Sequence, residues 1–178
     1  MIFKNNYWFF KSAIPPRICD DIIKFALDKT ETTGRIGYGK NKLDKEKLFK
    51  LKQQRNSDVV WLDDPWIYKE IEPFVKIANK NAGWNFQWDY PESIQFTKYK
   101  KGQFYDWHCD TSEQEGPKIR KISMTCQLTD ESEYEGGELE FDFRHYNPVK
   151  RDELQHVVRE KEILSKGSVV LFPSFIWH

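Results

Sequence analysis

The chain has 178 residues, the usual length of a single domain and enough to bury a core without disulfide staples. Its 28 Lys and Arg residues equal its 28 Asp and Glu residues, so there is no excess of positive charge for a nucleic-acid partner. We find neither an apolar run long enough for a membrane span nor a signal peptide. For this reason we expect no membrane partner. The three cysteines are widely spaced, so we expect free thiols and a reducing, cytoplasmic location.

The first part of the chain alternates between strand-like and helix-like patterns. Residues 7–14 are rich in aromatic side chains and end at Pro15-Pro16, which is typical of a short strand closed by a breaker. Apolar residues at helical spacing predict an amphipathic helix over residues 17–29. The Lys-rich residues 34–52 are expected to form an exposed loop.

A second strand and a second helix are predicted next. Residues 57–62 have the composition of a strand, and residues 66–82 place apolar side chains on one helical face. Gly83 suits the end of that helix, whereas Pro73 leaves open a shorter helix that begins there. We therefore expect residues 1–83 to act as a helical buttress within one domain that spans residues 1–178.

From Trp84 onward, the hydrophobic period changes to two. Trp84, Phe86 and Trp88 alternate with polar residues, which favours extended backbone. Six further short strands, separated by turn residues, are predicted at residues 94–99, 105–110, 119–128, 138–143, 156–160 and 167–172. Many short strands at this spacing indicate a sandwich or barrel. The fold class is therefore mainly β with flanking helices (α+β).

The segment His108-Cys109-Asp110 is the strongest chemical signal. Residues two apart on a strand point to the same side, so His108 and Asp110 could bind one metal ion. A second histidine would complete the two-histidine, one-carboxylate set that holds Fe(II) and leaves positions open. His178 is the leading candidate because an apolar segment that should be buried precedes it. His145 and His156 remain alternatives.

Three blocks of this sequence resemble the catalytic half of a known enzyme family. They are the segment from Tyr99 to Asp110, the segment from Leu128 to Phe141 with its Glu-Gly-Gly-Glu loop, and the segment from Lys166 to His178. In this order, they resemble the Fe(II)/2-oxoglutarate-dependent oxygenases of the prolyl 4-hydroxylase-like group, in particular its bacterial and phage-type members. The resemblance covers about residues 93–178.

The resemblance implies both a fold and a reaction. The fold is a double-stranded β-helix, or jelly roll, over residues 84–178 behind the α-helical N-terminal part. The reaction is hydroxylation of a peptidyl substrate, with prolyl residues as the leading class, and release of succinate and CO2. The implied cofactors are Fe(II), 2-oxoglutarate and O2, with ascorbate as an optional reductant. The implied partner is a peptide or protein, and the oligomeric state is left undetermined.

The resemblance also assigns roles to residues outside the metal set. Tyr99 matches a position that commonly contacts the co-substrate, and Arg55 matches one that lines the substrate groove. In related enzymes, the region equivalent to the Lys-rich stretch 40–52 often folds over the substrate. For Tyr99 the alternative is packing between sheets, and for Arg55 it is a solvated side chain.

One part of the family pattern lies beyond the end of this sequence. Similar enzymes carry an Arg or Lys about ten residues after the distal His, where it pairs with the far carboxylate of 2-oxoglutarate. The sequence ends at His178, so we expect either a truncated chain without the last strand or another basic residue in that role. Arg120 shares strand parity with Ile122 and Met124 and could point inward.

The sequence leaves two other classes of function open. A non-catalytic, cupin-like module could keep the metal set and lack the anchor for the co-substrate. A zinc hydrolase could use the same three ligands, but no nearby Glu has the spacing of a general base.

Overall fold

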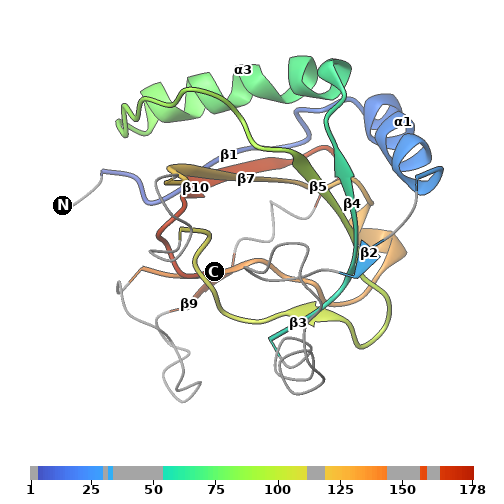
Figure 1. Cartoon of the computed structure of the whole chain (residues 1–178). Helices are drawn as coiled ribbons and strands as arrows, with labels where there is room; N and C mark the ends of the chain where they lie inside the picture. The colour runs from blue at the N-terminus through green and yellow to red at the C-terminus, as the bar shows by residue number, and fades with distance from the viewer. Residues whose placement is uncertain (1–3, 30–31, 34–53, 112–118, 144–156, 160–164) are drawn as a thin grey trace.

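The computed structural model describes residues 4–29, 32–33, 54–111, 119–143, 157–159 and 165–178 (Figure 1). Within these residues, two helices flank pairs of antiparallel strands. In chain order the elements are β1 (Trp8–Phe10), α1 (Pro16–Leu27), β2 (Thr32–Thr33), β3 (Arg55–Asn56), β4 (Asp58–Leu62), α3 (Pro65–Asn81), β5 (Ile94–Lys98), β6 (Phe104–Tyr105), β7 (Ile122–Cys126), the 3-10 turn η2 (Glu131–Glu133), β8 (Glu140–Asp142), β9 (Val157–Arg159) and β10 (Val169–Pro173). These elements confirm the predicted fold class, which is mainly β with flanking helices.

Both helices begin at a proline, whose missing N–H would have no intrahelical partner in the first turn. Helix α1 buries Cys19, Ile22 and Ala26, which recur every three or four residues and form one apolar face. Within the described residues, neither helix combines the length and the apolar composition needed to cross a bilayer.

Helix α3 continues through Pro73 without a break, so the alternative of a shorter helix is wrong. A proline inside a helix costs about 3 kcal/mol, because one hydrogen bond is lost and the ring crowds the preceding turn. The side chains of Ile67, Ile71 and Ala78 are buried on the opposite face. Burial of an aliphatic side chain contributes about 1.5–3 kcal/mol, so this apolar face outweighs the single proline.

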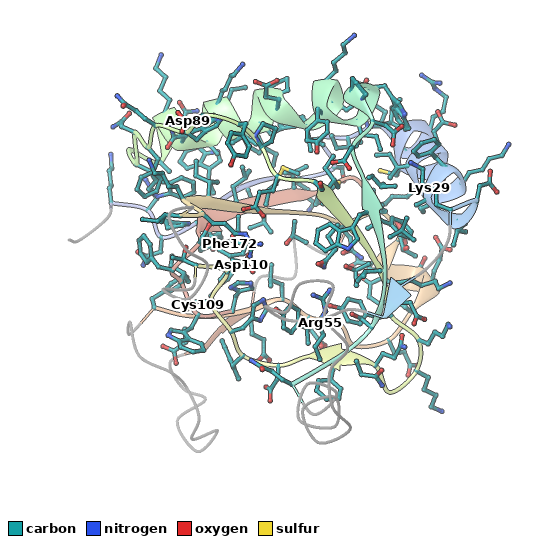
Figure 2. All side chains as sticks on the ribbon, viewed as in Figure 1. Lys29, Arg55, Asp89, Cys109, Asp110 and Phe172 are labelled. Carbon is teal, nitrogen blue, oxygen red and sulfur yellow. The ribbon has the colours of Figure 1, made fainter. Side chains whose placement is uncertain are left out.

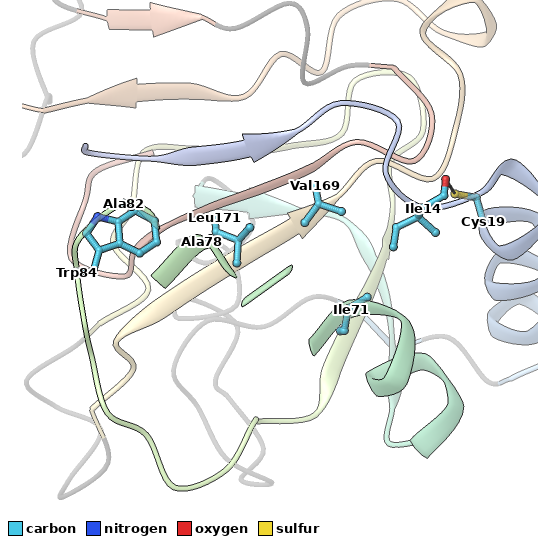
Figure 3. Close-up of a cluster of buried hydrophobic side chains, with 8 residues drawn as sticks. All are labelled: Ile14, Cys19, Ile71, Ala78, Ala82, Trp84, Val169 and Leu171. Carbon is cyan, nitrogen blue, oxygen red and sulfur yellow. Dashed lines mark hydrogen bonds between the residues drawn. The ribbon is translucent and has the colours of Figure 1, made fainter. Parts of the chain in front are cut away.

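Strand β10 is the centre of the main sheet, whose order is β1-β10-β7 with antiparallel neighbours on both sides. Val169 and Leu171 face a core cluster that includes Ile71 and Ala78 of α3 (Figure 3). Val170 and Phe172 face a second cluster on the other side of the sheet. Because both faces are covered, β10 is apolar at every position instead of alternating.

The other strands form a second three-stranded antiparallel sheet, with the order β2-β4-β5, and the two-stranded pairs β3-β6 and β8-β9. In Figure 1, α3 runs above the main sheet, and β3 lies on the side of the sheet away from this helix. An isolated β-bridge joins Asp142, at the end of β8, to Trp177 and so connects the C-terminal segment to the β8-β9 pair.

The alternating residues 84–88 and the predicted strand at residues 105–110 differ from a regular strand in the structure. Residues 84–88 do not form a strand, because Trp84 instead packs into the core beneath α3 and its indole N–H donates to the Asn5 carbonyl at 2.7 Å. Of residues 105–110, only Tyr105 belongs to a strand, so His108 and Asp110 lie in irregular backbone. Their proximity therefore does not come from the alternation of a strand.

Gly167 lies where three segments meet. Its N–H donates to the Gln127 carbonyl at 2.7 Å, and its carbonyl accepts from the Ile14 N–H at 2.9 Å. Its φ is +79°, and an added Cβ would overlap the backbone carbonyl of Ile14. Only glycine fits both the left-handed backbone and the close approach that starts β10.

Candidate metal centre

The structure brings His108, Asp110 and His178 together. One nitrogen of each imidazole and one carboxylate oxygen all lie within 4.8 Å of one another. The His108 Nε2 atom is 3.5 Å from Asp110 Oδ1, and the His178 Nε2 atom is 3.7 Å from Asp110 Oδ2. In Figure 2, Asp110 lies on the side of the main sheet away from α3. Among the described residues this is the only group of three such donors, and it matches the set that the sequence predicted.

Backbone pairing holds the two histidines side by side. The His108 N–H donates to the His178 carbonyl at 3.0 Å, and the His178 N–H donates to the His108 carbonyl at 3.1 Å. The turn after β10 directs the chain back toward this point, with the Ile176 N–H donating to the Pro173 carbonyl at 2.9 Å. The two segments therefore meet through main-chain bonds that need no metal ion.

Each imidazole is oriented by its other nitrogen. The Nδ1 atom of His108 lies 2.9 Å from the Asp106 carbonyl, and the Nδ1 atom of His178 lies 3.0 Å from the Ile176 carbonyl. A carbonyl can only accept, so both Nδ1 atoms carry a hydrogen and both Nε2 atoms keep a free lone pair. This is the usual way in which a protein prepares a histidine ligand.

The ionisation of the three groups also suits a cation. Burial, together with the neighbouring His108, lowers the pKa of His178 to about 4, so the ring is neutral at neutral pH. Burial alone would raise the pKa of Asp110, but the neighbouring His108 and His178 rings and the hydrogen bond from the Ser123 hydroxyl hold that pKa well below its usual range. A neutral imidazole and an ionised carboxylate are the forms that ligate metals.

The donor set therefore fits a divalent cation that accepts nitrogen and oxygen ligands. Three protein donors leave further coordination positions for small molecules, as in Fe(II) sites built from two histidines and one carboxylate. The three residues line a cavity, so the remaining positions would face open space.

Arg55 and Tyr105 support His108 from the side. The Arg55 guanidinium is buried, with 4% of the residue exposed, and lies 4.3 Å from the centre of the Tyr105 ring. The Tyr105 ring stacks on the His108 ring, with centroids 3.5 Å apart and planes 12° from parallel. Tyr105 was not predicted from the sequence, because the pairing of β3 with β6 that places it opposite Arg55 is visible only in the fold.

Arg55 has only neutral hydrogen-bond partners within the described residues. Its Nε donates to the Ser57 hydroxyl at 2.8 Å, and another guanidinium N–H donates to the Gln95 side-chain oxygen at 3.2 Å. Arg55 is therefore not a solvated surface side chain, which was the alternative to a role in the groove. Tyr99 is 50% exposed and lines the same cavity, and burial of its hydroxyl raises its pKa.

Arg120 lies beside the metal centre, but its charge is paired. Its Nε donates to the Glu92 carboxylate at 2.8 Å, and another guanidinium N–H donates to the Asp110 carbonyl at 3.0 Å. Arg120 was predicted to point inward because it shares strand parity with Ile122 and Met124. These two residues pack against the core cluster on the side of α3, which is the face of the sheet away from the metal centre. The face of β7 toward the metal centre carries Ser123.

Several sequence predictions fall outside the described residues. These are His145 and His156, the alternatives to His178, and the Lys-rich stretch 40–52, expected to cover the substrate. Two serines that contact the metal centre, Ser123 and Ser174, were not predicted. No pattern of residue types in the sequence distinguishes them from other serines.

Comparison with known proteins places this geometry in a family. Residues 94–178 match the family model of the 2OG-Fe(II) oxygenase superfamily. A viral collagen prolyl hydroxylase from Paramecium bursaria Chlorella virus-1, solved as a 2OG complex, has a TM-score of 0.60 and 21% identity, covering 96% of this chain and 78% of its own. A Pseudomonas putida prolyl-4-hydroxylase has a TM-score of 0.62 and 14% identity, covering 98% of this chain and 84% of its own.

No curated protein sequence is a significant match to this chain. At these identities the two solved structures show a shared fold, that of the 2-oxoglutarate oxygenases. The family match covers the segments that carry His108, Asp110 and His178. Residues 94–178, which carry the metal centre, therefore match the 2OG-Fe(II) oxygenase superfamily, and this match supports a 2-oxoglutarate-dependent dioxygenase with Fe(II), 2-oxoglutarate and O2 as its cofactors.

Proposed function

We propose that this dioxygenase hydroxylates a prolyl residue in a peptide or protein and releases succinate and CO2. The observation that carries the proposal is the preformed group of His108, Asp110 and His178 at the wall of an open cavity. The two solved structures that share its fold are prolyl hydroxylases, which supports the substrate class.

The three residues would hold Fe(II), which supplies the oxidising chemistry once 2-oxoglutarate and O2 are bound. The two Nε2 lone pairs and one Asp110 oxygen are the donors, and the carboxylate neutralises part of the ion's charge. The main-chain carbonyls of Asp106 and Ile176 keep both rings in the metal-binding tautomer. Stacking of Tyr105 on His108 covers one face of that ring from water.

The exposed aromatic residues support a prolyl peptide. Most large apolar side chains that are exposed in the described residues line the same cavity as the metal centre; they include Trp61, Trp88, Tyr90, Tyr99 and Phe104. Flat aromatic surfaces bind proline rings in extended peptides, whose limited flexibility lowers the entropy cost of binding. We assign Arg55 to the wall of this substrate groove.

The proposal has a structural part as well. Residues 1–178 would form one domain, with residues 1–83 as its helical buttress and the β-pairs closing a double-stranded β-helix. The antiparallel pairing of all strands in the described residues is consistent with this topology.

The direct test is turnover by the purified chain. Fe(II), 2-oxoglutarate, O2 and a proline-rich peptide are expected to yield succinate together with a peptide heavier by one oxygen atom on proline, measured by mass spectrometry. Succinate without a modified peptide would overturn the prolyl substrate class and leave the oxygenase assignment standing. A chain that binds Fe(II) but forms no succinate with any peptide would support a non-catalytic metal-binding module.

Arg120 and Tyr99 are proposed to contact the co-substrate, and Arg120 can be tested separately. Arg120→Ala is expected to raise the KM for 2-oxoglutarate about tenfold or more, because a hydrogen bond to a charged group contributes about 1.5–3 kcal/mol. Glu92→Gln is the matched variant, since it removes the carboxylate that competes for the same guanidinium. Its KM for 2-oxoglutarate is expected to stay level or fall.

Steady-state kinetics with 2-oxoglutarate and peptide varied in turn provide the measurement. If Arg120→Ala changes only the KM for the peptide, Arg120 belongs to the substrate groove instead. If neither KM changes, Arg120 acts only through its bonds to Glu92 and Asp110.

A further inference from the structure

We propose that Ser123 and Ser174 are positioning residues that form a directed pair of hydroxyls and fix the carboxylate of Asp110 for metal binding. This inference rests on the proposed metal site, because it concerns how one of its three donors is oriented. Neither serine belongs to the donor group, and neither would contact the metal ion itself.

Hydrogen bonds link the Asp110 carboxylate to the Ser123 hydroxyl and the Ser123 hydroxyl to that of Ser174, which is buried. The Ser123 hydroxyl lies 2.6 Å from Asp110 Oδ2 and 3.0 Å from the Ser174 hydroxyl. Ser174 is completely buried, with 0% of its surface exposed. A distance of 2.6 Å is typical of a hydroxyl bonded to an ionised carboxylate, which is about twice as strong as a bond between neutral groups.

Counting hydrogens gives the pair a direction. The ionised Asp110 carboxylate can only accept, so the single hydroxyl hydrogen of Ser123 is donated to Oδ2. The bond between the serines must then run the other way, with Ser174 donating to Ser123. A chain in which each donor is itself an acceptor strengthens every bond in it.

Ser174 also joins the segments that carry the donors. Its carbonyl accepts the N–H groups of Asp110 at 2.9 Å and Thr111 at 3.1 Å, and its own N–H donates to the Lys121 carbonyl at 3.1 Å. It lies four residues before His178 on the same turn. The residue therefore connects the Asp110 segment, the start of β7 and the segment of the distal histidine.

Position on β7 explains why Ser123 can reach the carboxylate. Its neighbours Ile122 and Met124 pack into the core on the side of α3, so Ser123 points to the opposite face. With Oδ2 held by Ser123, Oδ1 remains on the side of His108, 3.5 Å from its Nε2. Without the hydroxyl, the carboxylate could rotate about its terminal bond and present either oxygen.

The experiment measures metal binding by the whole chain, without turnover. Ser123→Ala is expected to weaken anaerobic Mn(II) binding about 10- to 100-fold, the usual cost of removing a hydrogen-bond partner from a metal ligand. Ser123→Thr keeps the hydroxyl and should restore most of the affinity. Ser174→Ala should weaken binding less than Ser123→Ala, because it removes only the second bond of the chain.

Ser168→Ala is the matched control. Ser168 is also completely buried, and its hydroxyl bonds Ser12 and Ser165, away from the metal centre. This variant is expected to lower the thermal midpoint and to leave Mn(II) affinity unchanged. The absorption spectrum of bound Co(II) gives a second readout, because a freed carboxylate changes the coordination that the spectrum reports; only the Ser123→Ala and Ser174→Ala spectra should shift.

The outcomes separate the inference from the proposed function. If the wild-type chain binds neither Mn(II) nor Co(II), the metal site itself is wrong. If the wild type binds and Ser123→Ala binds equally well with the same Co(II) spectrum, the positioning role is wrong while the metal site stands. If Ser168→Ala weakens binding as much as Ser123→Ala, the effect reports general loosening of the fold and overturns the inference.

Discussion

Asp110→Asn is expected to remove nearly all Fe(II)-dependent succinate formation and to weaken anaerobic Mn(II) binding by more than about 100-fold. Loss of a residue that only supports a ligand costs about 10- to 100-fold in affinity, and Asp110 is proposed to be a ligand itself. Asparagine keeps the shape and can still accept from Ser123. The change therefore isolates the negative charge that offsets the charge of the metal ion.

Asp21→Asn is a matched control for this variant. Asp21 lies on the exposed side of α1, where it pairs with Arg17 at 3.5 Å. Succinate formation and Mn(II) binding by this control should equal those of the wild type. Wild-type Mn(II) affinity in Asp110→Asn would exclude Asp110 as a ligand and, with it, the proposed metal centre.

Phe172→Ala is expected to lower the free energy of unfolding by about 3–5 kcal/mol, the range for truncating a fully buried aromatic side chain. Phe172 is 1% exposed, and its ring packs edge-on against Phe141 with centroids 5.1 Å apart. Its centroid is also 4.6 Å from that of His178, so the cavity left behind would free the distal histidine. Urea denaturation, with and without Mn(II), measures both effects.

Phe175→Ala removes the same side chain three residues later, where 38% of the residue is exposed. Its unfolding free energy should fall by about 1 kcal/mol or less, because less apolar surface is returned to water. Equal losses in the two variants would mean that Phe172 does not occupy the core of this sheet.

The local pattern of the sequence predicted the elements that are buried on a regular face. The helices α1 and α3 follow from apolar residues at helical spacing, and their observed ends differ from the predicted ones by one or two residues. Strand β10 follows from an uninterrupted apolar run, which can be explained only by burial on both faces. In these cases the energetics depend on residues close together in the chain.

Local sequence patterns do not predict the conformation where contacts between distant segments decide it. The alternation at Trp84, Phe86 and Trp88 favoured extended backbone, but these residues pair with no described strand, and the Trp84 side chain packs into the core. His108 and Asp110 were placed together on one strand, yet they lie in irregular backbone. What holds them is a pair of main-chain bonds to the far C-terminal segment.

Arg120 illustrates the same limit for electrostatics. The sequence showed a basic residue near the metal motif, but it could not show that Glu92 already pairs with it. Nor could it show that Arg55, distant in sequence, is buried against Tyr105, the ring that stacks on His108. Whether a charge is free or neutralised depends on partners that only the folded chain selects.

The sequence alone determined which residue types are available as metal donors, because the ionisation and lone pairs of His and Asp are properties of the side chains themselves. It also determined the helices and the central strand, whose hydrophobic pattern is local. Only the tertiary structure decided that His108, Asp110 and His178 meet within 4.8 Å, and that two serines orient the carboxylate. Such contacts join residues far apart in the chain, and no periodicity in the sequence encodes which of them pair.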